Sequence, residues 1–158
     1  MALDHYIAPT VPEAPAMAVR LGAGSGTSNQ VDTKEQGKIV KLAGESRYDL
    51  AVAGDDIEAI IYAVELAPQN GFSIGSVYSE GRARVVFDGL QATPGTGVVA
   101  VGDYVVAGSV TAKGTALTSY PKVCKATSQG TQKSLWRVVS LGAVGTGAVG
   151  TVGVIARV

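Results

Sequence analysis

Residues 37–44 read Gly-Lys-Ile-Val-Lys-Leu-Ala-Gly, and residues 102–108 read Gly-Asp-Tyr-Val-Val-Ala-Gly. In both stretches a glycine and a charged residue precede a short apolar run that ends in Ala-Gly. Because glycine supplies turn conformations and β-branched residues favour strands, each stretch predicts a strand between two turns. The likeness indicates either an internal duplication or a coincidence, since any strand flanked by turns has this texture.

Similar short runs, rich in Val, Ile and Tyr, follow one another from Val31 onwards, with Gly, Asp and Ser between them. They recur at intervals of about 8–12 residues, which is typical of barrels and sandwiches. We therefore expect an all-β fold with a compact β-barrel-like domain. The expected strands cover residues 38–42, 48–52, 60–66, 75–78, 82–87, 104–107, 122–127, 135–141 and 151–158.

The segment 55–66 fits two structures. Its first four residues, Asp-Asp-Ile-Glu, match a helix capping box, and apolar residues recur at helical spacing at Ile57, Ile60, Ile61 and Val64. The apolar run over 59–64 equally suits a strand that is buried on both faces. The β texture on both sides favours the strand, which is our prediction.

The first thirty residues differ from the rest of the chain. Pro9, Pro12 and Pro15 favour an extended path, and the Gly- and Ser-rich stretch 21–29 reads as a flexible linker. We therefore expect an extended N-terminal arm over residues 1–30 and a β domain over residues 31–158. A disordered tail and an arm that becomes ordered against a partner both fit this composition.

The composition excludes several kinds of chemistry. The chain has 158 residues, 46% of them apolar, with one Cys and one His. These numbers exclude an intrachain disulfide, a zinc site of several thiolates and a His-rich metal site. The net charge is zero, which does not suggest a nucleic-acid binder. The uncharged stretch 138–156 is long enough to span a membrane, but its five glycines favour two strands and a turn.

The motifs that carry chemistry elsewhere do not assemble here. Residues 145–150 match G-x-G-x-x-G, but too little chain follows for the helix and second strand of a dinucleotide site. Asp55, Asp56 and Glu58 form the densest acidic group, and we expect solvated turn carboxylates or a helix N-terminus. We expect Cys124 to be a small buried thiol and Trp136 to anchor the core. The sequence predicts no enzyme, no cofactor and no metal.

Charge is distributed unevenly along the chain. Residues 1–103 carry all 13 carboxylates and 7 basic side chains, whereas residues 104–158 carry 6 basic side chains and no carboxylate. In a single barrel these halves would interleave and give a mixed surface. The alternative is electrostatic complementarity between subunits or with a partner lattice.

Several pieces of the sequence together resemble a known family. They are Gly-Lys-Ile-Val-Lys-Leu at 37–42, Gly-Asp-Asp-Ile at 54–57, Gly-Ser-Val at 75–77, Gly-Arg-Ala-Arg-Val at 81–85, Val-Gly-Asp-Tyr-Val at 101–105 and Trp-Arg-Val-Val at 136–139. With them, residues 35–158 resemble the small capsid decoration (cement) proteins of tailed bacteriophages. That family usually continues Gly-Asp-x-Ile with a glycine and a strand, whereas Glu58 and Ala59 follow here.

The resemblance implies a β-barrel or β-tulip domain, often trimeric, on the outside of an icosahedral capsid. It implies that the chain is made in the host cytoplasm and clamps neighbouring major capsid subunits, helped by a terminal arm. A tail, baseplate or head–tail connector module and a carbohydrate-binding β domain are the alternatives. The candidate capsid contacts lie in the arm: His5, Tyr6, Ile7, Pro9, Val11, Pro12, Pro15, Met17, Val19, Arg20 and Leu21.

Overall fold

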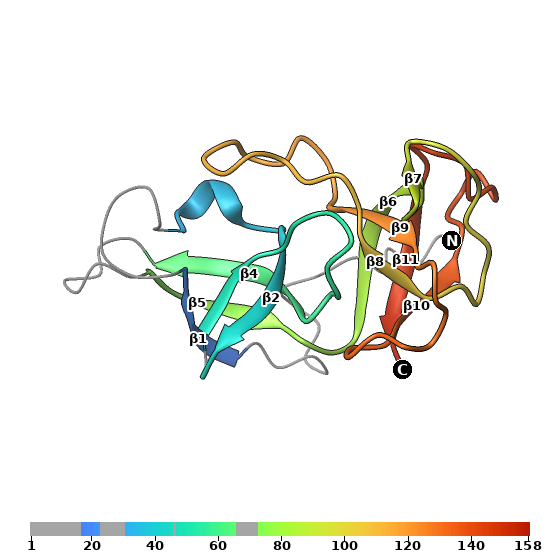
Figure 1. Cartoon of the computed structure of the whole chain (residues 1–158). Helices are drawn as coiled ribbons and strands as arrows, with labels where there is room; N and C mark the ends of the chain where they lie inside the picture. Colours follow the sequence, from blue (N-terminus) through green and yellow to red (C-terminus); the bar gives the residue numbers. More distant parts are fainter. Residues whose placement is uncertain (1–16, 23–30, 46, 66–72) are drawn as a thin grey trace.

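The computed structural model describes residues 17–22, 31–45, 47–65 and 73–158. These residues form eleven strands and one short 3-10 helix, and they contain no α-helix. The strands make two units that lie side by side, the first from β1–β5 and the second from β6–β11 (Figure 1). The predicted all-β fold is therefore confirmed.

Unit 1 is a closed barrel with the strand order β1-β3-β2-β4-β5. Strand β1 closes it, because it pairs in parallel with β3 and antiparallel with β5. The elements of this unit are β1 (Met17–Leu21), η1 (Thr33–Glu35), β2 (Ile39–Gly44), β3 (Arg47–Leu50), β4 (Ala59–Glu65) and β5 (Ser73–Tyr78).

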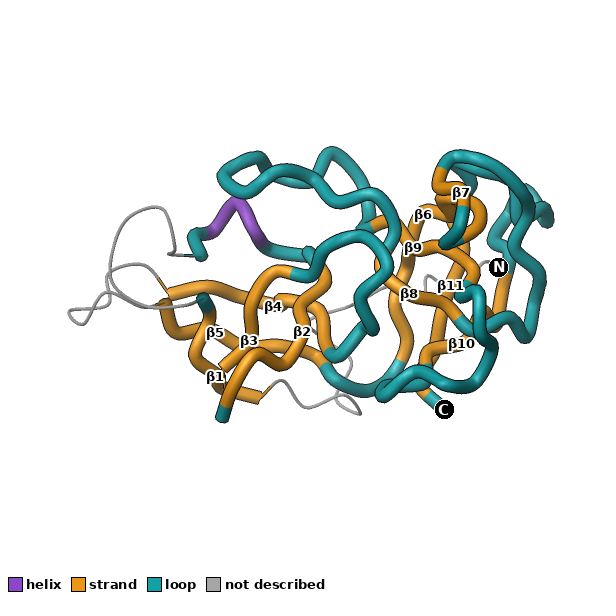
Figure 2. Tube along the Cα trace, in the orientation of Figure 1, coloured by secondary structure: helices purple, strands orange, loops and turns teal. Residues whose placement is uncertain are grey.

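Unit 2 has the strand order β10-β11-β6-β9-β8, with the short β7 paired to the end of β6. The two ends of this sheet come together, because Tyr104, just before β8, forms a β-bridge with Arg137 of β10. Figure 2 shows these strands curving around one centre. The elements are β6 (Arg82–Leu90), β7 (Thr93–Pro94), β8 (Val105–Ala107), β9 (Lys122–Lys125), β10 (Trp136–Ser140) and β11 (Val152–Arg157).

The two units repeat one topology. Strands β1, β2, β3, β4 and β5 correspond to β6, β8, β9, β10 and β11, which gives both units the same neighbours in the same order. The single parallel pair of unit 1, β1 with β3, corresponds to the single parallel pair of unit 2, β6 with β9. The two units therefore agree in the order of their five corresponding strands and in the relative direction of each neighbouring pair.

The correspondence extends to single hydrogen bonds. Gly37 N–H donates to the Ile61 carbonyl at 2.9 Å, and Gly102 N–H donates to the Val138 carbonyl at 2.8 Å. In return Ile61 N–H donates to the Lys38 carbonyl at 3.0 Å, as Val138 N–H does to the Asp103 carbonyl at 2.9 Å. The stretches 37–44 and 102–108 thus occupy equivalent places. The structure thus adds shared strand order and register to the likeness in sequence, which is the outcome expected of an internal duplication.

A glycine against a β-bulge recurs at the same place in both units. The β4–β5 register shifts between Ile61 and Ala63, and the β10–β11 register shifts between Val138 and Ser140. On the facing strand, the residue that precedes the partner of Ala63 or Ser140 is a glycine, Gly75 on β5 or Gly153 on β11, which lies against the Ala63 or Ser140 carbonyl. A Cβ on Gly153 would meet the Phe87 ring and lie 2.6 Å from the Ser140 carbonyl oxygen, so no larger residue fits.

The predicted strands and the structure agree except at β1, near the N-terminus, and at the two-residue β7, which were not predicted. All nine expected strands are present, and 59–65 is a strand, as predicted. The boundary expected at residue 30 was wrong, because Met17–Leu21 is a strand inside the closed barrel. Val19 and Leu21 of this strand, which pairs with β5, are buried. The proline-rich and glycine-rich flanks concealed this five-residue strand. Residues 1–16 and 23–30 of the expected arm lie outside the described residues.

The units share the largest apolar cluster of the described residues. Ile39, Ile57 and Ile60 from unit 1 pack in it with unit 2 residues that include Phe87 and Trp136. Trp136 is buried there, as expected. A smaller cluster around Leu21 and Val77 fills the inside of unit 1. The shared cluster joins the units into one packed body.

Replacement of Gly153 by alanine is expected to destabilise the protein by about 2 kcal/mol or more, because the added methyl overpacks the space beside Phe87 and Ser140. Chemical denaturation measures the effect. Gly44→Ala is the matched control, since a Cβ there meets nothing closer than 3.8 Å. Equal denaturation midpoints for Gly153→Ala and the wild type would contradict the close packing of Gly153 against Phe87 and Ser140.

Candidate functional site

The acidic group at 55–58 fastens the two units to each other. Asp56 Oδ2 accepts a hydrogen bond from Lys133 N–H at 2.8 Å, and Glu58 Oε2 accepts one from the Ser134 hydroxyl. Asp55 caps its own turn by accepting from Val52 N–H, and it pairs with Lys41 at 2.7 Å. These are turn and loop carboxylates, as one of the two expectations had it, but they are half-buried and hydrogen-bonded, and no helix begins at them. The longer turns of unit 2, which sequence reasoning left unassigned, supply the partners.

A second fastening involves a buried ion pair. Glu35 and Lys38 are both buried, and Lys38 Nζ lies 3.4 Å from Glu35 Oε1. Glu35 also accepts from Gly114 N–H, and Lys38 donates to the carbonyls of Thr111 and Ala112. These contacts hold loop 108–121 of unit 2 over β2 and η1 of unit 1 (Figure 2). Each buried charge thus has its own partners, as burial requires.

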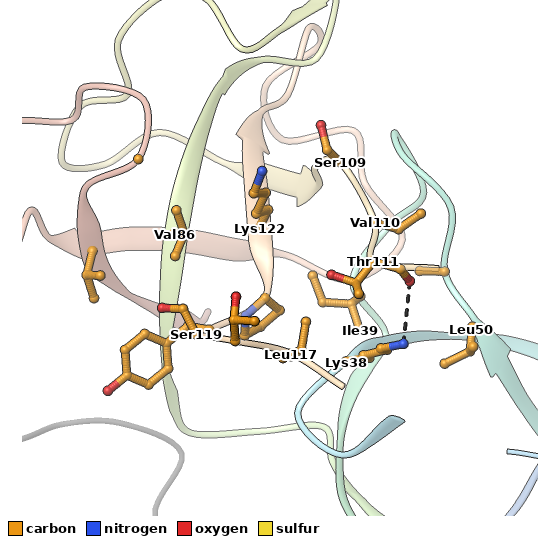
Figure 3. Close-up of a pocket in the computed structure, with 16 residues that line it drawn as sticks. Lys38, Ile39, Leu50, Val86, Ser109, Val110, Thr111, Leu117, Ser119 and Lys122 are labelled. Carbon is orange, nitrogen blue, oxygen red and sulfur yellow. Dashed lines mark hydrogen bonds between the residues drawn. The ribbon is translucent and has the colours of Figure 1, made fainter. Parts of the chain in front are cut away.

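Loop 108–121 and the two units line an open pocket of about 260 Å³. In Figure 3 Lys38 points toward Thr111, and Ile39, Leu117 and Val86 line the apolar wall. Lys122, half exposed, lies at the rim and is 3.9 Å from Asp88. Asp88 already accepts from the backbone and hydroxyl of Ser109. Lys38, Asp88 and Ser109 thus hold the loop in place.

The other residues singled out in the sequence occupy structural positions. Cys124 is buried, as expected. Residues 145–150 form a loop and turn, and no helix follows them. Within the described residues no three His, Cys, Asp or Glu side chains are grouped as a metal site would require.

The uncharged stretch 138–156 forms β10, a loop and β11, as predicted. The described part of the chain contains no helix with the length and apolar character that a membrane crossing requires.

The candidate capsid contacts divide into two groups. Arg20 and Met17 are exposed on β1, whereas Val19 and Leu21 are buried in the barrel and cannot present a side chain to a partner. The others lie outside the described residues: His5, Tyr6, Ile7, Pro9, Val11, Pro12 and Pro15.

The charge asymmetry follows the two units. The described residues of unit 1 carry eight carboxylates and five basic side chains, and residues 82–157 carry two carboxylates and eight basic side chains. Interleaving of the two charges was the expectation for a single barrel. Instead each unit has its own sheet, so the two parts of the sequence do not share one barrel. Among the described residues, carboxylates exceed basic side chains in unit 1, and basic side chains exceed carboxylates in unit 2.

The end of unit 2 carries an exposed apolar surface, here called the valine face: Val98, Val101, Val144 and Val149. These side chains are between 41% and 66% exposed. They come from two loops that pair through a Val98–Ala148 bridge and a hydrogen bond from Val99 N–H to the Gly147 carbonyl at 2.9 Å. Residues 89–102 and 138–156 contain no charged side chain. The four exposed valines thus lie on two loops that are joined to each other by backbone hydrogen bonds.

The valine face was not predicted from the sequence. The signal was present in the two uncharged Val- and Gly-rich stretches, but only the β-bridge shows that they meet. Comparison of the chain with protein-family models, with curated proteins and with solved structures finds no match.

Cys124 is expected to react slowly with an aromatic disulfide reagent at pH 8 in the native protein. Burial, together with the Asp88 carboxylate, raises the pKa of the thiol from 9.0 to about 11, so little thiolate forms. Because the folded state holds this proton more tightly, the contribution to stability is complete below pH 9 and is lost as the pH rises toward 11. Denatured protein is the control. A native protein that reacts as fast as the denatured one would contradict the burial and the raised pKa of Cys124.

Proposed function

We propose that this chain is a non-enzymatic structural protein that binds the outer surface of a bacteriophage capsid and cements neighbouring major capsid subunits. The observation that carries the proposal is the valine face, a fixed and uncharged apolar surface at one end of the molecule. Such a surface gains free energy by burial against another protein, at about 25 cal/mol per Å² of apolar area. The resemblance to decoration proteins, described above from the sequence, supplies the identity of the partner.

The construction of the protein supports a clamp. Two closed units share one apolar cluster and are fastened by Asp56, Glu58 and the Glu35–Lys38 pair. A body fastened in this way transmits load between two attachment points, because packed interiors deform little. Binding to the assembled capsid, and not to free subunits, would then stabilise the assembled state by linkage.

The remaining parts of the proposal concern assembly. We take the protein to be a homotrimer on the capsid exterior, with the segment before β1 acting as an arm that covers further capsid surface. Repeated attachment on a lattice adds avidity to each contact. The arm is shorter than the sequence indicated, since it ends before Met17.

A double replacement at the valine face, Val98→Lys with Val144→Lys, is expected to weaken binding to mature capsids assembled without this chain by about tenfold or more, because two charges must lose water on contact. Co-sedimentation with such capsids measures binding. Val52→Lys, an equally exposed valine on unit 1, is the control for added charge and should bind as the wild type does. Unchanged binding by the double variant would reject the valine face as the contact, and failure of the wild type to bind capsids would reject the proposed function.

Two truncated chains distinguish the contribution of the arm to capsid binding from the contribution of β1 to folding. A chain that begins at Met17 keeps all of β1 and should retain the wild-type denaturation midpoint while losing affinity for capsids. A chain that begins at residue 23 lacks β1 and should lose the cooperative unfolding of unit 1, because β3 and β5 lose the strand between them. Full-strength attachment of the chain that begins at Met17 would contradict the arm hypothesis.

A further inference from the structure

The two units meet through different surfaces. Unit 2 contributes the end of β8, where the Ala107 carbonyl accepts from Gly54 N–H at 2.8 Å and Ala107 N–H donates to the Asp55 carbonyl at 2.9 Å. Unit 1 contributes the turn after β3. An interface between two different surfaces of similar units is heterologous. The contact inside the chain uses the strand end of unit 2 and the turn of unit 1. The corresponding strand end of unit 1, on β2, and the corresponding turn of unit 2, after β9, are not paired with each other within one chain.

The position in unit 1 that corresponds to Ala107 is Leu42. Leu42 faces Tyr48 on β3 as Ala107 faces Val123 on β9, and both lie two residues beyond an equivalent valine, Val40 or Val105. Ala107 is 1% exposed because the turn from unit 1 covers it, whereas Leu42 is 55% exposed. The large apolar side chain of Leu42 therefore lies on the surface where the equivalent position is an interface.

Leu42 also presents free backbone groups. Ala51 N–H bonds to the Ile39 carbonyl at 3.0 Å, so Ile39 and Ala51 form a hydrogen-bonded pair, and alternation along the ladder makes Leu42 and Tyr48 a non-bonded pair. The N–H and C=O of Leu42 thus point away from β3, as those of Ala107 point away from β9. On that side β4 pairs only with Ile39 and Val40, and no described backbone group bonds to Leu42.

We propose that the Leu42 edge, residues 41–43 of β2, binds unit 2 of a second copy of this chain through turn 127–133. Turn 127–133 follows β9, just as the turn of unit 1 that contacts Ala107 follows β3. Each turn contains a glycine with positive φ, Gly130 in unit 2 and Gly54 in unit 1. Turn 127–133 is exposed over most of its length, and its last residue, Lys133, donates its N–H to Asp56 inside the chain. An extended backbone segment added to an open strand edge is a common form of protein association.

Charge favours this occupant over an unrelated strand. In the proposed contact the acidic unit 1 of one copy meets the basic unit 2 of the next, and opposite charges at an interface speed association and fix its direction. Inside the chain, the carboxylates of Asp56 and Glu58 bind unit 2 through the Lys133 amide and the Ser134 hydroxyl. Repetition of a heterologous contact gives a ring if the rotation closes and an open chain otherwise.

Sedimentation velocity of the purified full chain, without capsids, tests the inference independently of the proposed function. The wild type should associate with increasing concentration. Leu42→Lys should weaken that association by about tenfold or more, because the charged side chain is covered in the contact. Val52→Lys places a lysine at a side chain of matched exposure, 54% against 55% for Leu42, outside the proposed contact, and should associate as the wild type does. A wild type that stays monomeric, or a Leu42→Lys variant that associates normally, would overturn the inference.

Cross-linking gives a second test that does not depend on the stability of the lysine variant. A Leu42→Cys chain mixed with a Ser128→Cys chain should form a mixed dimer with a short bismaleimide, because the two positions meet between copies. Leu42→Cys alone should not cross-link to itself, and the native Cys124 is buried. Efficient self-cross-linking of Leu42→Cys, or no mixed dimer at concentrations where the wild type associates, would overturn the proposed pairing.

Discussion

The hydrogen bonds donated by Gly37 and Gly102 are the constraint on which the rest of the structure depends. Each lies where the chain turns into β2 or β8, with φ of +82° or +94°, a conformation that favours glycine. From there its N–H reaches the carbonyl of Ile61 or Val138 on the strand that completes the ring. A closed unit has few free strand edges, which limits the ways in which it can bind another protein.

Closure also explains where the functional surfaces lie. The two units cannot exchange strands once each is closed, so they join through turns and loops. Asp56, Glu58, Glu35 and Lys38 carry that junction. Exposed apolar side chains of the described residues include the valine face on unit 2 and the Leu42 edge on unit 1. We propose the first for binding to a capsid and the second for contact between copies, so that one molecule can serve both.

Much of the fold follows from the sequence, because short apolar runs between turn residues are a local signal. All nine expected strands exist, and the choice of a strand for 59–65 over a helix was right because the neighbouring strands outweigh helical spacing. Local sequence signals fail where a structure depends on pairing with segments that are distant in the sequence. Strand β1 was missed because five residues between proline- and glycine-rich flanks gain stability only from β3 and β5. The roles of Asp56 and Glu58 and the valine face depend on segments more than 40 residues away, which no local pattern reveals.

Hydrogen exchange at equivalent amides tests the central claim, that the chain repeats one closed five-stranded unit, most directly. The account predicts strong protection of Gly102 and Val138, which join β8 to β10, together with Gly37 and Ile61, their counterparts in unit 1. Exchange of the Gly102 and Val138 amides at the rate of exposed loops, beside protected Gly37 and Ile61, would show that unit 2 is an open sheet and would contradict the duplication.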